Sequence, residues 1–200
     1  MSSFEVVGGK KLSGTIHPQG AKNEALQIIC AVLLSKEKII IKNVPDIIDV
    51  NKLIDLLKSL GVKVRKTSKG TFEFQSNDID LNYLNTEDFE LKGKSLRGSI
   101  MIVGPLLARF GVASIPRPGG DKIGRRRLDT HFENLIKLGG NFTYDKENKK
   151  YKIESKRLKG CKILLDQPSV TGTANIIMSS VLADGETTIY NAACEPYIQQ

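Results

Sequence analysis

Along this chain, stretches with the hydrophobic periodicity of a helix alternate with stretches that have the alternation of a strand, and the order of these stretches repeats. Beyond residue 20 the pattern is helical, with a shared face of five apolar residues: Ala25, Ile28, Ile29, Val32 and Leu33. An apolar run at 39–41 then predicts a strand, and an amphipathic pattern over 50–60 predicts a second helix that a glycine ends. Alternation in 62–65 and 71–75 predicts a hairpin.

A second stretch has the same order of elements. Its helical pattern begins at Ser95, and an alternating run at 112–115 predicts the strand. A second helix is predicted over 128–138, followed by a hairpin of 141–144 with 150–154.

Two pairs of positions align between these copies. Leu60-Gly61 and Leu138-Gly139 both stand where the second helix ends, and Lys22 falls opposite Arg97 near the start of the first helix. Such alignment is typical of repeated supersecondary units that bury their faces on one another.

A third copy begins near Ser169. Its first helix is predicted to bury one apolar face: Ala174, Ile177, Met178, Val181 and Leu182. A strand at 187–190 follows, and Asn191-Ala192-Ala193 matches the turn Asn43-Val44-Pro45 of the first copy. Because Gln200 stands where the second helix is due, we expect this chain to be the front part of a longer protein.

The predicted fold is therefore α+β, built from repeated βαβαββ units at about 22–80, 95–155 and 165–200, the last one truncated. Before them, alternation in 3–17 around Gly8-Gly9 predicts a short hairpin.

Composition narrows the classes of partner and compartment. The 200 residues are 40% hydrophobic and carry a formal net charge of +8, which favours an anionic partner. Three cysteines, an odd number without a Cys-x-x-Cys pair, argue for a reducing compartment and against a disulfide framework or a zinc site. No signal peptide or membrane-length apolar run is present in the sequence, so we expect a cytoplasmic protein without a membrane partner.

The charge is concentrated in the stretch Arg117–His131, RPGGDKIGRRRLDTH. A Pro-Gly-Gly turn precedes Asp121, and four cations follow: Lys122, Arg125, Arg126 and Arg127. Arginine forks suit a ligand with several phosphates. The alternative is a solvated basic turn.

Five ordered stretches carry a family resemblance: Gly20-Ala21-Lys22-Asn23-Glu24-Ala25-Leu26, Ser95-Leu96-Arg97-Gly98-Ser99-Ile100 with Gly104-Pro105-Leu106, Pro118-Gly119-Gly120-x-x-Ile123-Gly124-x-Arg126, Asp166-x-x-Ser169-Val170, and Asn191-Ala192-Ala193-x-Glu195-Pro196. Together they resemble the UDP-N-acetylglucosamine enolpyruvyl transferases. The resemblance implies an inverse α/β barrel with helices inward, in which roughly six units form two lobes. It also implies that residues 1–21 are strands of the other, absent lobe and that 22–200 are a substrate-binding lobe.

The family reaction moves the enolpyruvyl group of phosphoenolpyruvate onto UDP-N-acetylglucosamine, releases phosphate and commits the sugar nucleotide to peptidoglycan synthesis. By resemblance, the catalytic residues are Asp121, Lys22 and Arg126. Phosphoenolpyruvate is held by Lys22, Asn23 and Arg126. The residues implied for the UDP-sugar are Asn23, Arg97, Arg126, Arg127, Leu128, Asp129, Thr130, His131, Ser169, Val170 and Thr171. The resemblance implies no cofactor, no metal and no nucleic acid, and it requires the missing C-terminal lobe.

Several positions depart from the family pattern. Most relatives carry a cysteine at Asp121, the residue that fosfomycin alkylates, so we expect insensitivity to this antibiotic because a carboxylate lacks the thiolate's nucleophilicity. Arg127, Thr130 and Thr171 also replace common family residues, which leaves backbone contacts there available. The family's catalytic aspartate base lies in the missing half, so we expect this chain alone to be inactive.

Other interpretations remain open at this point. The shikimate-pathway enolpyruvyl transferase is a close relative, but a Gly-Ser-Lys-Ser start is expected there in place of Gly20-Ala21-Lys22-Asn23. A nucleic-acid-binding or RNA-end-processing protein would use the net charge, although no aromatic platform accompanies the arginines. A non-catalytic sugar-nucleotide-binding lobe is the third. Lys22-Asn23 and Ser169 could also be simple helix caps, and Arg97 a snorkelling surface residue.

Overall fold

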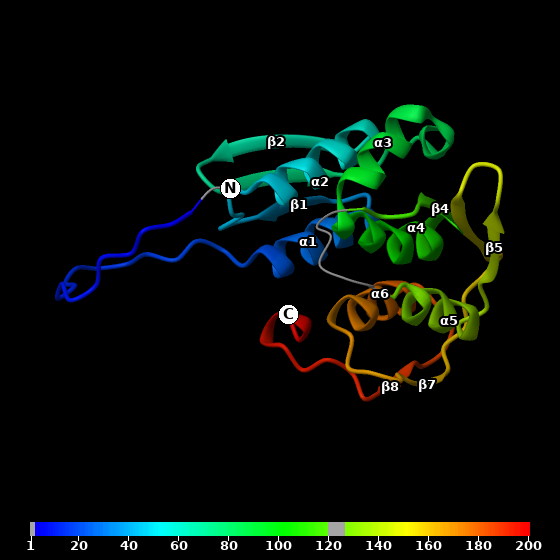
Figure 1. Cartoon of the computed structure of the whole chain (residues 1–200). Helices are drawn as coiled ribbons and strands as arrows, with labels where there is room; N and C mark the ends of the chain where they lie inside the picture. The colour runs from blue at the N-terminus through cyan, green and yellow to red at the C-terminus, as the bar shows by residue number, and fades with distance from the viewer. Residues whose placement is uncertain (1–2, 120–126) are drawn as a thin grey trace.

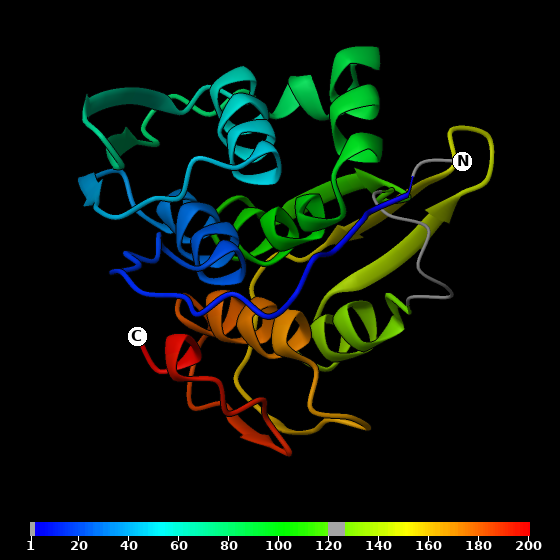
Figure 2. The ribbon, with the colours of Figure 1, turned by 60° about the vertical axis from the view of Figure 1, so that its left-hand side comes forward.

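The helices of this protein gather in the middle of the fold and three small sheets lie around them (Figures 1 and 2). The computed structural model describes residues 3–119 and 127–200. Helices α1, α4 and α6, which begin the three repeated units, pack on one another or on each other's flanking turns. This is the inward-helix, outward-sheet arrangement that the family resemblance implied.

The first unit lacks the leading strand of the predicted βαβαββ pattern, since residues 3–21 contain no strand. Its elements are α1 (Lys22–Ala31), η1 (Val32–Leu34), β1 (Lys38–Ile41), α2 (Ile48–Ser59), β2 (Lys63–Ser68) and β3 (Thr71–Gln75). The sheet has the order β1-β3-β2 with antiparallel pairs, so that Phe74 lies between Ile39 and Val64. The predicted hairpin is confirmed, with a register shift between Lys66 and Ser68.

The second unit repeats this plan with additions. Its elements are η2 (Leu81–Asn85), α3 (Glu87–Ser95), η3 (Arg97–Ile102), α4 (Val103–Phe110), β4 (Val112–Pro116), α5 (Asp129–Lys137), β5 (Asn141–Asp145) and β6 (Lys150–Glu154). The sheet order β4-β6-β5 matches that of the first unit. The sequence pattern missed η2 and α3, and the single helix predicted from Ser95 is divided into η3 and α4.

The third unit contains β7 (Lys162–Leu164), α6 (Val170–Ser180), β8 (Thr188–Tyr190) and η4 (Pro196–Ile198). Strands β7 and β8 pair in parallel, and α6 is the crossover between them. The sequence pattern predicted β8 and missed β7, which is only three residues long.

The aligned positions have the same backbone conformation in each copy. Gly61 after α2 has φ +106°, and Gly139 after α5 has φ +102°, the left-handed conformation that ends a helix most easily at glycine. The turn asparagines Asn43 and Asn191 have φ 56° and 54°. Repeats read from the sequence are thus repeats of local geometry.

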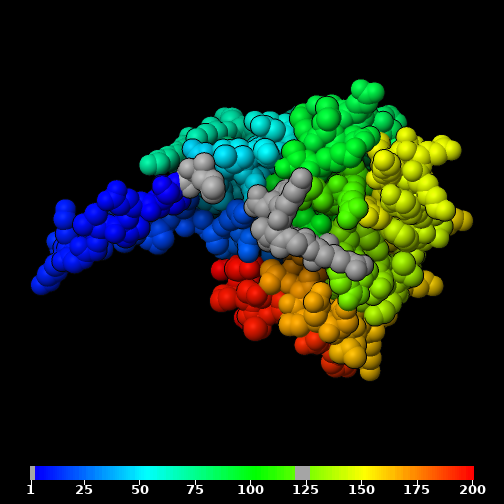
Figure 3. Space-filling view, in the orientation of Figure 1, coloured from blue at the N-terminus to red at the C-terminus, as the bar shows by residue number. Residues whose placement is uncertain are grey.

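The hairpin predicted within residues 3–20 is not present in the structure. This segment contains no strand, and in Figure 3 it projects from the body of the molecule. Phe4 is 100% exposed and Leu12 is 91% exposed. Alternation alone does not produce a sheet, because each strand also needs a partner and an apolar face to cover.

The buried face of helix α6 differs from the one predicted from the sequence. Ala174 and Met178 are buried as expected, but Ile177 is 36% exposed although it lies within the helix. Val181 is 61% exposed and Leu182 is 44% exposed, since both follow the end of the helix. The buried side instead carries Asn175 and Ile176, each 0% exposed.

Candidate functional site

The N-terminal ends of α5 and α6 meet in the structure. Ser169 is the N-cap of α6, and its Oγ accepts a hydrogen bond from the Gly172 N–H at 3.1 Å. A Cβ built on Gly172 would lie 3.0 Å from Thr130 Cγ2 and 3.0 Å from Ser169 Oγ. A larger residue at this position would push the first turns of the two helices slightly apart.

The two helix ends differ in charge, and the difference makes the start of α6 the more favourable place for an anion. Asp129 occupies the first turn of α5, whereas α6 has no acidic residue there. Backbone N–H groups at a helix start lack intrahelical acceptors and attract anions. At α6, Ser169 accepts from the Gly172 N–H, and the amides of Val170 and Thr171 belong to the first turn, where no helical carbonyl precedes them.

Arg127 forms the cationic side of the site. Its Nε donates to Asp129 Oδ2 at 2.7 Å, and its Nη1 lies 3.6 Å from Asp166 Oδ2. This hydrogen bond lowers the pKa of Asp129, so the carboxylate is ionised at neutral pH. Because Asp166 lies just before α6, its ion pair with Arg127 holds the Arg127 side chain near the start of that helix.

Arg97 begins η3 and reaches the same place. Its Nη2 donates to the backbone oxygen of Arg127 at 3.1 Å. Two guanidinium groups from different parts of the second unit thus lie beside the start of α5, where they favour a dianionic ligand.

His131 lies behind this surface and is 3% exposed. Its Nδ1 is 2.9 Å from Asn175 Nδ2, and its Nε2 is 3.3 Å from Thr171 Oγ1. Burial and, to a lesser degree, the charge of Arg97 lower the pKa of His131 to about 4, with Asp129 opposing both. The imidazole is therefore neutral at pH 7.

Lys22 and Asn23 occupy the first turn of α1. Lys22 Nζ forms an ion pair with Asp49 Oδ2 at 2.9 Å, with both side chains partly exposed. A Cβ at Gly98 would be 3.1 Å from Leu26, so α1 packs against η3, the element that begins at Arg97. The helix starts predicted to align thus belong to neighbouring elements.

The structure therefore places most of the predicted residues together. Contacts join Arg97, Arg127, Asp129, Thr130, His131, Ser169 and Thr171. Leu128 is the N-cap residue of α5, and Val170 begins α6. Asp121 and Arg126 lie outside the described residues.

A family model described as EPSP synthase (3-phosphoshikimate 1-carboxyvinyltransferase) matches residues 6–200. The chain belongs to the EPSP synthase family. Within it, the chain is 58% identical over all 200 residues to a UDP-N-acetylglucosamine 1-carboxyvinyltransferase of Bacteroides fragilis, and 54% identical to one of Porphyromonas gingivalis. It covers 46% of each of those proteins, so it spans about half the length of these curated relatives.

Solved structures support the same fold for this EPSP synthase family member. The enolpyruvyl transferase NikO from Streptomyces tendae aligns with a TM-score of 0.74 at 18% identity, covering 96% of this chain and 44% of NikO. EPSP synthase from Acinetobacter baumannii aligns with a TM-score of 0.71 at 16% identity, covering 93% of this chain and 42% of that one.

Sequence reasoning missed Asn175 as part of the site. The signal was present, since an asparagine stands between Ala174 and Ile176 on a helix that is otherwise largely apolar or small. A polar residue in such a position must be satisfied by partners inside the protein.

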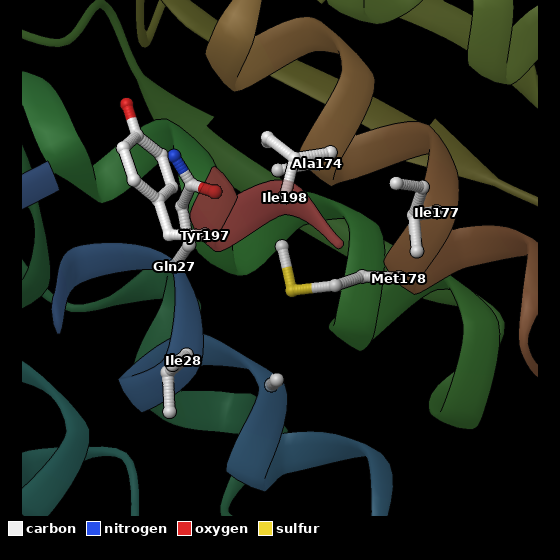
Figure 4. A pocket seen from close by; sticks show the side chains of 8 residues that line it. Gln27, Ile28, Ala174, Ile177, Met178, Tyr197 and Ile198 are labelled. Carbon is white, nitrogen blue, oxygen red and sulfur yellow. The ribbon is translucent and has the colours of Figure 1, made fainter. Parts of the chain in front are cut away.

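Away from these residues, a concavity lies between α1 and α6 and is also lined by η4 (Figure 4). Its lining is Gln27, Ile28, Ala31, Ala174, Ile177, Met178, Tyr197 and Ile198. Its volume of about 100 Å³ is below the ~300 Å³ at which small-molecule sites begin. We therefore exclude this groove as the sugar-nucleotide site.

Nowhere within 3–119 and 127–200 do three His, Cys, Asp or Glu side chains gather as metal ligands would. Among the helices there, we find no membrane-spanning candidate.

Proposed function

We propose that the protein to which this chain belongs transfers the enolpyruvyl group of phosphoenolpyruvate to UDP-N-acetylglucosamine and releases phosphate, the first committed step of peptidoglycan synthesis. The observation that carries this proposal is the 58% identity, over the whole chain, to the Bacteroides fragilis enzyme of that name. The protein acts in the cytoplasm, without a metal or cofactor.

The geometry of the site supports the following roles for its residues. The diphosphate of the UDP-sugar binds at the start of α6, where it accepts from the amides of Val170 and Thr171. Arg97 and Arg127 neutralise its charge, and the ionised Asp129 accepts hydrogen bonds from the uridine end.

The chemical step belongs to residues nearer the start of α1 and in the loop before α5. Lys22, Asn23 and Arg126 hold phosphoenolpyruvate, and Asp121 takes part in proton transfer or loop closure. Binding of phosphoenolpyruvate draws Lys22 from Asp49, because the ion pair is exposed and weak. The C-terminal lobe supplies the aspartate base, so the 200 residues alone bind ligand without turnover.

A second candidate acceptor is 3-phosphoshikimate, because the matching family model is described by that substrate. Both acceptors carry phosphate, so cations alone do not distinguish them. The identity to the sugar-nucleotide enzymes places UDP-N-acetylglucosamine first.

The experiment measures phosphate release from phosphoenolpyruvate by the protein expressed from its intact gene, with each acceptor in turn. We expect release with UDP-N-acetylglucosamine only. Release with 3-phosphoshikimate only, or with neither acceptor, would overturn the proposal.

A matched pair of variants locates the site. Arg97→Gln should raise the KM for UDP-N-acetylglucosamine by about tenfold or more, because a charge-assisted contact is lost. Arg65→Gln removes an exposed arginine that pairs with Glu73 on the outer sheet, and its KM should match the wild type. Equal effects of the two substitutions would contradict the assignment of Arg97.

A further inference from the structure

Asn175 is fully buried in α6, and both polar atoms of its side-chain amide are hydrogen-bonded. Its Oδ1 accepts from the Gly104 N–H at 3.0 Å, and its Nδ2 donates to the Ile100 carbonyl at 3.0 Å. The second Nδ2 proton is left for His131 Nδ1 at 2.9 Å. One side chain thus connects α6 with η3, α4 and α5.

These partners fix the direction of the amide. A flipped amide would place its oxygen against the Ile100 carbonyl and its nitrogen against the Gly104 N–H, so both hydrogen bonds would be lost. A Cβ on Gly104 would lie 2.6 Å from Asn175 Oδ1, which shows how closely the two backbones enclose the group.

The amide direction fixes the tautomer of His131. Because Asn175 Nδ2 is a donor, His131 Nδ1 must accept, and the single proton of the neutral ring is on Nε2. Nε2–H then donates to Thr171 Oγ1 at 3.3 Å. The Thr171 hydroxyl proton is left to point away from the histidine, and Thr171 lies exposed in the first turn of α6.

We propose that Asn175 is a positioning residue of the binding site: by holding His131 in the Nε2–H tautomer, it makes the Thr171 hydroxyl a hydrogen-bond donor to the anionic group bound at the start of α6. The inference rests on the proposed function in taking that group to be the diphosphate of the UDP-sugar. It assigns His131 a role through Thr171 and needs no proton transfer by the imidazole.

The first test reads the tautomer directly. In protein labelled with ¹⁵N-histidine, and with the resonance assigned through His131→Gln, we expect a protonated Nε2 and an unprotonated Nδ1. In Asn175→Asp the new oxygen requires a donor from the ring, so the proton should appear on Nδ1. A wild-type ring protonated on Nδ1 would refute the proposal, whether or not any ligand binds.

The second test measures UDP-N-acetylglucosamine affinity by calorimetry in a double-mutant cycle. Thr171→Val and Asn175→Asp should each weaken binding about tenfold, since each removes the same donated hydrogen bond. Thr171→Ser keeps the hydroxyl and should bind as the wild type does. The double variant should bind no more weakly than Thr171→Val.

The outcomes separate the two proposals. Additive losses in the double variant would mean that Asn175 acts through the packing of the helices, which overturns the inference. Absence of wild-type binding would contradict the proposed function, while the tautomer measurement still decides the role of Asn175. If Asn175→Asp does not fold, Thr171→Val and Thr171→Ser decide alone: equal affinities of those two would refute the donor role of Thr171.

Discussion

Protonation of His131 should destabilise the folded protein well above the pH at which most carboxylates titrate. The ring is 3% exposed, and its Nδ1 accepts from Asn175 Nδ2. An added proton on Nδ1 would face that donor, and the charge would lie in a site without contact with water. The folded state therefore binds the proton only when its pKa of about 4 is reached.

The sign and size of this pH effect on the free energy of unfolding follow from the difference in proton binding between the folded and the unfolded state. In the unfolded chain this histidine titrates near 6.5, so between pH 6.5 and 4 the unfolded state binds more protons and stability falls as the pH falls. The full difference between 6.5 and about 4 corresponds to about 3 kcal/mol, of which about 2.5 kcal/mol is lost by pH 4.5.

The assay is urea unfolding of the wild type and of His131→Gln at pH 7, 6, 5 and 4.5. Glutamine changes the stability at neutral pH but removes the titration, so the stability difference between the two proteins should shift by about 2.5 kcal/mol across this range. Carboxylates such as Glu73 and Asp88, whose pKa values are lowered by lysine partners, also make the protein less stable as the pH falls. This contribution is the same in both proteins and cancels in their difference. A constant difference between the two proteins from pH 7 to 4.5 would refute the reasoning.

Two further substitutions test the packing around the site. Gly104→Ala should lower the free energy of unfolding by about 1–3 kcal/mol, because its Cβ would lie 2.6 Å from the backbone oxygen of Asn175. The control Gly8→Ala, whose Cβ meets nothing within 4 Å, should be near neutral in denaturant titration. Equal stabilities of the two variants would contradict the close contact of α4 and α6. Ser169→Ala should cost about 1 kcal/mol of stability through the lost cap, and it should also weaken UDP-N-acetylglucosamine binding in calorimetry. Thr86→Ala removes the equivalent cap of α3, and it should lower stability alone; weaker ligand binding in that variant would show that capping as such, rather than the start of α6, governs affinity.

The sequence by itself determined the repeated local structure. Glycines at 61 and 139 and asparagines at 43 and 191 adopt left-handed conformations that few other residues tolerate, so their spacing predicts where helices and turns end. The start of α6 was readable as well, because its N-cap Ser169 acts on Gly172, only three residues away, whereas α1 begins after Ala21 without a side-chain cap.

Only the tertiary structure decided which surfaces meet. Periodicity placed Val181 and Leu182 on the buried face of α6, whereas α4 and α5 pack against this helix and bury the side that carries Asn175. The hairpin expected in 3–17 had the right alternation and no partner strand. The contact of His131 with Thr171 and Asn175 joins residues about 40 positions apart, and its direction depends on an amide that η3 and α4 orient. No local pattern encodes such a contact, because the energies that fix it come from burial and from partners distant in the chain.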